Sequence, residues 1–243
     1  MKRYPFISAF FVILFLFILY GQSVFASYDI LPLLGKVIYV DAGHGGRDAG
    51  AIFGSIYEKD INLAISKALS DSLLKRGATV YMIRDDDSDL SEDDDILKKR
   101  GDLQRRVKAI DESNAQLYLS IHVNAFKDDP SQKGAEVLYN SVNSLNKLLA
   151  DTIMDYFKKD LGSTRHVSMT DLYLYTNSQT PGVLIECGYL TNSTERQLLL
   201  DSTYQEKLGE VIADGVVDYF RKASKAPTSD NNVLKSDDNY IRF

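Results

Sequence analysis

Short apolar runs alternate with amphipathic segments along the chain after its first 30 residues. Runs rich in β-branched and aromatic residues predict strands, whereas apolar residues spaced three and four apart predict helices. The predicted strands are 36–41, 79–84, 116–122, 135–140, 171–175 and 182–187. The predicted helices are 60–76, 96–112, 143–159 and about 193–221. This alternation predicts an α/β fold, with one central, twisted, mostly parallel or mixed β-sheet and helices on both faces of it.

The N-terminus has the pattern of an export signal. Lys2 and Arg3 precede an apolar run from Phe6 to Tyr20, and the small residue Ala26 follows at a plausible cleavage point. Residues 1–26 are therefore predicted to be a signal peptide or an N-terminal membrane anchor. The protein is expected to be exported, and to contact the membrane if this segment is retained.

The rest of the chain divides by composition into three parts. Residues 27–35 read as a linker and residues 36–222 as one globular domain. Residues 223–243 are rich in Ser, Asp, Asn and Lys and read as a flexible polar tail.

Charge and cysteine content exclude several classes of protein. The net charge of −6 argues against a sequence-general nucleic-acid binder, which needs a basic face. The single cysteine, Cys187, excludes an intrachain disulfide framework and a thiolate zinc finger. With only three histidines, any metal site must draw its remaining ligands from carboxylates.

Three chemically active side chains follow apolar strands. His44 comes after the first predicted strand, His122 ends the third, and Glu186 ends the last. Ligands of open α/β sheets bind beyond the carboxyl ends of the strands. Two of three histidines at such positions therefore predict a metal site at this edge of the sheet.

A catalytic zinc site needs a third protein ligand, with water in the fourth position. Glu58, at the start of the first predicted helix, is the best candidate, although a glutamate there equally suits the helix dipole. Glu186 is then expected to be the general base that takes a proton from the attacking water.

Other candidate motifs have ordinary structural explanations. Cys187 is a rival nucleophile, but alternation along its strand points it away from the face that carries Glu186. His166 lies in a polar connection and reads as a surface residue. The acidic segment from Asp85 to Asp95 lacks the glycine and the glutamate of a calcium loop, and reads as a solvated loop.

Five segments in order resemble the zinc-dependent N-acetylmuramoyl-L-alanine amidases, the type-3 amidase family. These segments are IYVDAGHGGRDAGAI (38–52), EKDINLAISKAL (58–69), RRVKAIDESNAQLYLSIHVNA (105–125), KGAEVLYN (133–140) and PGVLIECGYLTN (181–192). The resemblance implies one zinc ion per chain on His44, Glu58 and His122, with Glu186 as the catalytic glutamate. Residues 36–222 would then be the amidase catalytic domain, acting on peptidoglycan.

The same resemblance matches Arg106 to a family arginine without assigning it a role. Asp41 and Asn124 are expected to orient the ligands. Unlike the division amidases of the family, the chain goes from Tyr139 directly into the next predicted helix. The short chain with its N-terminal apolar segment, and the stretch 101–125 in particular, are most similar to the germination-specific amidases of endospore formers.

That branch implies removal of peptide stems from spore-cortex muramic acid before muramic δ-lactam forms. An activating protein partner at the membrane is compatible with it. Two alternatives stay open: a zinc peptidase that acts on the peptide stem, and a non-catalytic wall-binding module, which would have no need of Glu186.

Overall fold

The computed structural model describes residues 10–18, 30–92 and 97–225. Its strands are β1 (Val37–Ala42), β2 (Ile52–Phe53), β3 (Ile56–Tyr57), β4 (Thr79–Met82), β5 (Leu117–Asn124), β6 (Glu136–Tyr139), β7 (Ser168–Met169) and β8 (Gly182–Tyr189). Its named helices are α2 (Glu58–Lys75), α3 (Lys98–Glu112), α4 (Ser144–Leu161), α5 (Tyr173–Asn177), α6 (Ser193–Leu199) and α7 (Ser202–Ala223). Residues 10–18 are also helical.

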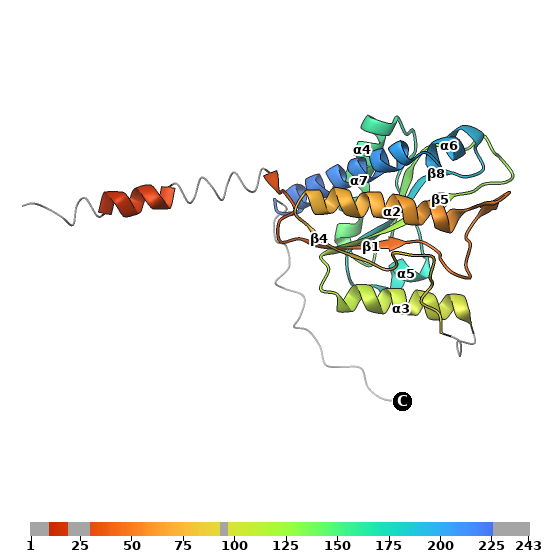
Figure 1. Ribbon diagram of the computed structural model, residues 1–243, viewed down its shortest axis with the longest axis horizontal. Coiled ribbons are helices and arrows are strands. Elements are labelled where there is room, and N and C mark those ends of the chain that lie inside the picture. The colour runs from red at the N-terminus through yellow and green to blue at the C-terminus, as the bar shows by residue number, and fades with distance from the viewer. Residues whose placement is uncertain (1–9, 19–29, 93–96, 226–243) are drawn as a thin grey trace, which may run out of the picture.

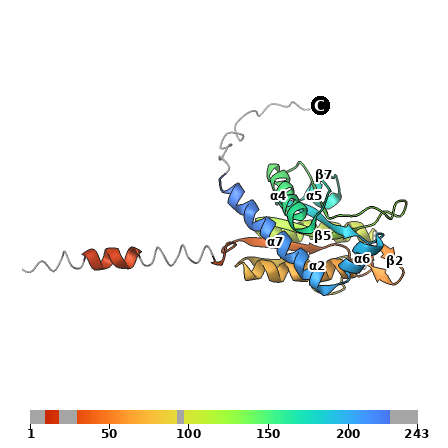
Figure 2. The ribbon, with the colours of Figure 1, turned by 90° about the horizontal axis from the view of Figure 1, so that it is seen from above.

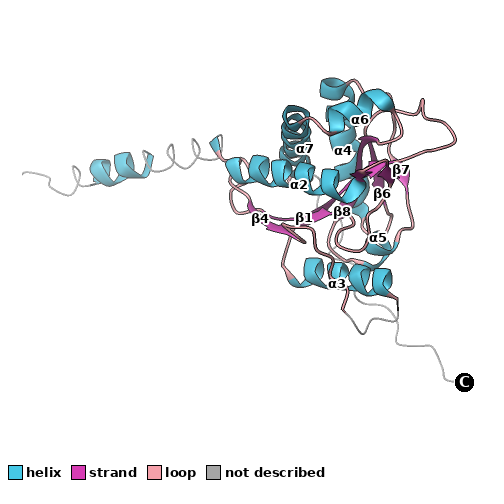
Figure 3. Ribbon diagram, turned by 45° about the vertical axis from the view of Figure 1, so that its right-hand side comes forward, coloured by secondary structure: helices cyan, strands magenta, loops and turns pink. Residues whose placement is uncertain are grey.

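The central sheet has six strands in the order β4-β1-β5-β8-β6-β7 (Figure 3). The strands β4, β1, β5 and β8 are parallel, and β6 runs antiparallel to β8. The carboxyl ends of β1, β5 and β8 therefore lie side by side at one edge of the sheet. Because β6 runs in the opposite direction, its first residue, Glu136, lies at that same edge.

Helices cover both faces of the sheet. The helices α2, α4 and α7 pack together on one face, and α3 with α5 covers the other (Figures 1 and 2). The larger apolar core lies under the first group, where α7 contributes Leu208, Ile212 and Val216. A smaller cluster around Ile110 and Tyr118 lies under α3. The predicted α/β fold, a mixed sheet with helices on both faces, is confirmed.

Two predicted elements are wrong in detail. Residues 171–175 do not form a strand, because the chain turns into the short helix α5 and buries Leu174 in the cluster beneath α3. The edge of the sheet is formed instead by β7, just before that segment. The predicted final helix is two helices, because the side chain of Asp201 caps a new N-terminus by accepting a hydrogen bond from the backbone of Tyr204.

The folded body begins before the predicted boundary at residue 36. Leu33, in the predicted linker, is fully buried in the main core, and its backbone N–H donates to the carbonyl of Arg76. Among the described residues, no helix is both long and apolar enough to cross a membrane. The predicted cleavage point at Ala26, and nearly all of the predicted tail, lie outside the described residues.

Candidate active site

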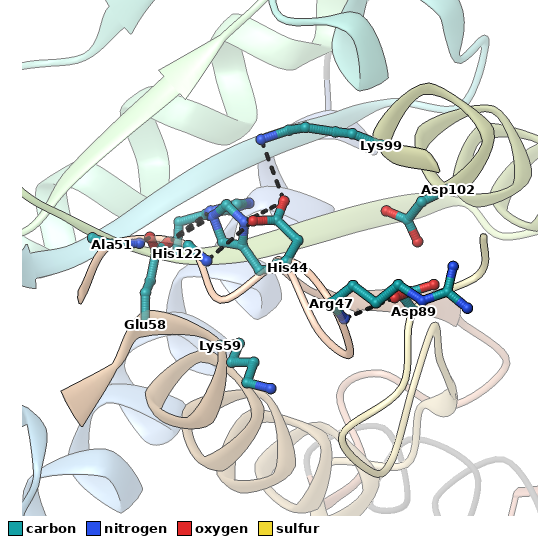
Figure 4. Close-up of polar contacts among 12 residues, drawn as sticks. His44, Arg47, Ala51, Glu58, Lys59, Asp89, Lys99, Asp102 and His122 are labelled. Carbon is teal, nitrogen blue, oxygen red and sulfur yellow. Dashed lines mark hydrogen bonds and ion pairs between the residues drawn. The ribbon is translucent and has the colours of Figure 1, made fainter. Parts of the chain in front are cut away.

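The structure brings two histidines and a glutamate together beyond the carboxyl ends of β1 and β5. His44 follows β1 with φ of +62°, Glu58 is the first residue of α2, and His122 lies in β5. His44 Nε2 and His122 Nδ1 each lie 3.1 Å from Glu58 Oε1. Donor atoms of the three side chains lie within 4.8 Å of one another (Figure 4). All three candidate ligands from the sequence thus meet at one point.

The electrostatics of this point favour a bound cation. Burial opposes the imidazolium form, but Asp48 and Glu58 raise the pKa of His44 to about 9. Burial also opposes ionisation of Glu58, yet His122 and His44 hold the pKa of that carboxyl well below its usual range. Neighbouring anions stabilise any positive charge placed among them. Two imidazoles and one carboxylate are a known donor set for catalytic zinc, so these residues fit that ion.

Glu186 lies on the strand next to His122. The two residues pair in register across β5 and β8, and both line a pocket of about 370 Å³ with the other candidate ligands. Oε2 of Glu186 is buried and has no hydrogen-bond partner among the described residues. Burial, together with the carboxylates of Glu58 and Glu136, raises the pKa of Glu186 to about 8. A buried oxygen without a partner is rare, and here it belongs to a residue that lines the same pocket as the candidate ligands.

The two side chains set aside in the sequence lie where they were predicted. Cys187 is buried in the main core, on the face of β8 away from Glu186. Burial raises the pKa of its thiol, so the nucleophilic thiolate is disfavoured. His166 is exposed. Neither side chain lines the pocket that holds Glu186.

Further side chains hold the candidate ligands in place, and the sequence did not indicate them. Asp48 Oδ2 lies 3.0 Å from His44 Nδ1, on the opposite side of the ring from Glu58, and 3.3 Å from the Nζ of Lys99. The Nδ2 of Asn62 donates to Glu58 Oε1 at 3.1 Å. A hydrogen bond at one ring nitrogen fixes the tautomer, and so leaves His44 Nε2 available as a ligand.

Arg106 fixes the backbone that carries His44. It is among the largest fully buried side chains, and it pairs with Asp41 and Asp102. Its remaining N–H groups donate to the carbonyls of Ala42 and His44, at 3.0 and 2.7 Å. Asp41, expected to orient the ligands, pairs with Arg106 and so contributes to this support of the His44 backbone.

Asn124 also differs from its expected orienting role. Its Nδ2 donates to Glu136 Oε1 at 3.2 Å, and its Oδ1 accepts from the backbone N–H of Ala125. These are hydrogen bonds within the edge of the sheet around Glu186, and none of them reaches His44, Glu58 or His122.

The acidic segment after β4 is more than a solvated loop. Asp87 accepts a hydrogen bond from the backbone N–H of Gly46, and Asp89 accepts one from that of Arg47. The ammonium group of Lys59 pairs with Asp87 at 2.6 Å. These carboxylates therefore hold the glycine-rich loop that follows His44, through contacts between segments about 40 residues apart.

A mixed α/β sheet with two histidines and a glutamate gathered at its edge, beside a separate buried glutamate, is an arrangement typical of metal-dependent hydrolases. The family model for N-acetylmuramoyl-L-alanine amidase matches residues 38–218. The chain belongs to this amidase family.

Individual relatives agree with that assignment. The germination-specific N-acetylmuramoyl-L-alanine amidase of Bacillus subtilis is 38% identical over 239 residues, which are 93% of this chain and 98% of that protein. The amidase LytC of the same organism is 34% identical over 78% of this chain, but over only 36% of its own length.

Solved structures give the same result. The CwlD amidase of Clostridioides difficile, solved in complex with the GerS lipoprotein, superposes with a TM-score of 0.73 at 38% identity, covering 77% of this chain and 100% of that one. The amidase AmiC2 of Nostoc punctiforme superposes with a TM-score of 0.68 at 28% identity, covering 76% of this chain and 97% of that one. The predicted family, fold and enzymatic class are confirmed, and the protein is an N-acetylmuramoyl-L-alanine amidase acting on peptidoglycan.

Proposed function

We propose that this amidase is a zinc enzyme, with one ion held by His44, Glu58 and His122 and with Glu186 as its general base. The single observation that carries this proposal is the convergence of three donor atoms within 4.8 Å, beside a buried glutamate oxygen that has no hydrogen-bond partner in the described part of the chain. Zinc bound there would polarise the scissile carbonyl and lower the pKa of a water molecule.

Glu186 moves the proton in this proposal. Its Oε2 accepts a proton from the attacking water and passes it to the nitrogen that leaves. A neighbouring cation would lower the pKa of Glu186 from the value near 8 that burial and nearby carboxylates give it. The carboxylate form needed to accept a proton would then prevail at neutral pH.

Substitution of Glu186 by glutamine separates the base from the ligands. Glutamine keeps the size and polarity of the side chain but cannot accept a proton at neutral pH. Zinc content and melting temperature are expected to match wild type, while turnover falls roughly 10²-fold or more. Loss of zinc in this variant would identify Glu186 as a ligand and would contradict its assignment as base.

The bond is proposed to be the amide between the lactyl group of N-acetylmuramic acid and L-alanine of the peptide stem. The site chemistry alone would suit a zinc peptidase equally well, and the family match decides for the amidase. Labelling new amino groups after digestion of peptidoglycan is expected to reveal L-alanine, on glycan strands of unchanged length. A new D-alanine or diaminopimelate amino terminus would favour the peptidase.

We further propose an extracytoplasmic role in spore-cortex maturation and germination. The support is the near full-length match to a relative named germination-specific, together with the apolar N-terminal pattern. A strain without this protein is expected to build cortex that lacks muramic δ-lactam. Normal δ-lactam in that strain would refute the cortex role and leave the amidase activity standing.

A lipoprotein partner is proposed from the structural relative, which was solved in complex with one. Such a partner would hold the enzyme at a membrane surface and activate it there. Co-purification of the full-length chain from its own cells, followed by peptide mass spectrometry, is expected to recover a lipoprotein. Recovery of the amidase alone from solubilised membranes would contradict this proposal.

A further inference from the structure

A polar hollow of about 420 Å³ lies at the starts of β6 and β7, beside the pocket of the candidate ligands. Glu136, Lys133, Arg165 and His166 contribute to its wall. Glu136 pairs in register with Glu186 across β6 and β8. The hollow therefore begins one strand beyond Glu186, on the side of that residue away from His122.

Arg165 is held rigidly in this hollow. Its Nε donates to the carbonyl of Lys133 at 2.9 Å, and its Nη2 donates to Gln132 Oε1 at 2.7 Å. Its guanidinium carbon lies 4.7 Å from the ring centroid of Tyr189. Nη1 makes no hydrogen bond to any described residue. A guanidinium fixed on three sides can bind an anion with little further loss of side-chain freedom.

Glu136 places a negative charge at the end of the hollow that adjoins Glu186. Its Oε1 accepts hydrogen bonds from Tyr189 Oη at 2.6 Å and from Asn124 Nδ2 at 3.2 Å, which fix the carboxylate beside Glu186. Lys133 and Arg165 line the same hollow, and the Arg165 guanidinium lies on the ring of Tyr189, whose hydroxyl bonds Glu136. Moving away from Glu186, a substrate would meet negative charge first and positive charge next.

The position of Glu186 indicates where the peptide stem of the substrate begins, and this step rests on the proposed function of Glu186 as general base. Glu186 returns its proton to the leaving nitrogen, so the first residue of the released peptide, which carries that nitrogen, starts beside Glu186. The candidate ligands occupy the β1 and β5 side, which leaves the β6 and β7 side for the peptide.

The spacing between strands agrees with a peptide stem that extends from β8 towards β6. Neighbouring strands lie about 4.8 Å apart, so β6 and β7 are about 5 and 10 Å from β8. An extended chain advances about 3.5 Å per residue, so the second stem residue lies about 7 Å from the cut nitrogen. That position lies just beyond β6, on the side of Glu136, whose partner Tyr189 carries the Arg165 guanidinium on its ring.

We propose that Arg165 binds the free carboxylate of the second stem residue, D-glutamate, and so selects stems that carry this charge. The released peptide has an ammonium group on L-alanine and a carboxylate on the next residue. Glu136 followed by Arg165 matches that order of charge. An amide at the second position offers no charge to the guanidinium, so stems with D-isoglutamine are poorer substrates.

The test uses the full-length chain and two polymeric peptidoglycans that differ only at the second stem residue, D-glutamate or D-isoglutamine. Wild type is expected to prefer the acid by about tenfold in kcat/KM, the worth of one charged hydrogen bond. Arg165→Gln is expected to lose this preference through a higher KM for the acid, with kcat little changed. Arg165→Lys is expected to keep part of it.

Arg196→Gln is the matched control. The Arg196 guanidinium also stacks on an aromatic ring, 3.7 Å from the Phe53 centroid, and its Nη1 also bonds a backbone carbonyl, that of Leu190. This variant is expected to keep the full preference for the acid, because Arg196 is outside the hollow.

The possible results distinguish the role of Arg165 from the proposed amidase function. Equal cleavage of both polymers by wild type would overturn the role of Arg165 while leaving the amidase intact. An unchanged preference in Arg165→Gln would assign the selection to another residue, and would also overturn it. Failure to release L-alanine amino termini from either polymer would instead overturn the proposed function itself.

Discussion

Replacing Arg106 by methionine tests whether the buried arginine holds the candidate site together. Methionine has a similar length and packs well, but it cannot donate hydrogen bonds. The substitution leaves Asp41 and Asp102 without their cation, and the carbonyls of Ala42 and His44 without their donor. Of these groups, Asp41 is almost completely buried, and among the described residues its carboxylate retains only the hydrogen bond from Ser120.

Removing one partner of a buried ion pair costs about 3–5 kcal/mol, because the other charge stays buried and unpaired. Arg106 is 2% exposed, so screening by solvent offers little relief. We therefore expect the metal-free protein to lose about 3–5 kcal/mol of unfolding free energy at pH 7. The backbone of His44 should loosen as well, so the variant should bind zinc more weakly.

This loss should shrink as the pH falls. In wild type, burial opposes ionisation of Asp41, but Arg106 and Ser120 hold its pKa below the ordinary value. That contribution is present above the unfolded pKa, about 3.9, and is lost as the pH falls through the folded pKa. In the variant, burial without a cation raises the pKa of Asp41, so acid neutralises the residue and relieves the penalty.

Urea unfolding of the chelator-treated full-length proteins, followed by circular dichroism, measures both effects. Lys108→Met on the same helix is the control, since that side chain is 70% exposed and its substitution should change stability by less than about 0.5 kcal/mol. A loss below about 1 kcal/mol for Arg106→Met at pH 7 would refute the reasoning. A loss that stayed constant down to pH 3 would assign it to packing rather than to charge.

Three other substitutions probe the site. Gly43→Ala should lower zinc content without removing any candidate ligand, because a Cβ there would lie 2.3–2.7 Å from atoms of the His122 ring; full zinc by metal analysis would contradict this. Glu58→Gln should lose zinc, since three protein ligands are the usual minimum for a catalytic site, and retained zinc would place the third ligand elsewhere. Cys187→Ala should keep most activity in a peptidoglycan digestion assay, whereas a folded but inactive variant would revive the thiol mechanism.

The sequence predicted the sheet well because apolar, β-branched runs are a local signal. It failed where a longer-range contact decides the structure. The alternation in residues 171–175 suits a strand, yet burial of Leu174 beneath α3 turns the segment into α5. The split of the last helix depends on Asp201 acting as a cap, a choice that a continuous helical pattern conceals.

In the candidate site, too, local sequence signals were predictable, whereas features that depend on long-range contacts were not. The positions of His44, His122 and Glu186 were predictable because each lies near or just after the end of an apolar strand, and strand ends gather at one edge. Glu58 needed the family resemblance, since a glutamate at a helix start has an ordinary explanation. Arg106 matched a family position, but its role appears only when β1 and α3 are placed together, 65 residues apart along the chain.

The strand order also places the candidate metal ligands, the proposed base and the proposed substrate-binding group at different strands along one edge of the sheet. The candidate ligands His44 and His122 lie at β1 and β5, the proposed base at β8, and the proposed carboxylate site beyond β8, beside β6. Asp48 contacts His44 after β1, whereas Arg165 contacts Lys133, Gln132 and Tyr189, so the two share no contact partner among the described residues. Sites without shared partners should act independently. In the double variant Asp48→Asn/Arg165→Gln, zinc affinity should equal that of Asp48→Asn alone, about 10–100-fold below wild type. Its substrate-charge preference should equal that of Arg165→Gln alone. Zinc titration and the paired-polymer assay measure the two quantities separately, and a further drop in zinc affinity on adding Arg165→Gln would show that the two ends of the edge are coupled.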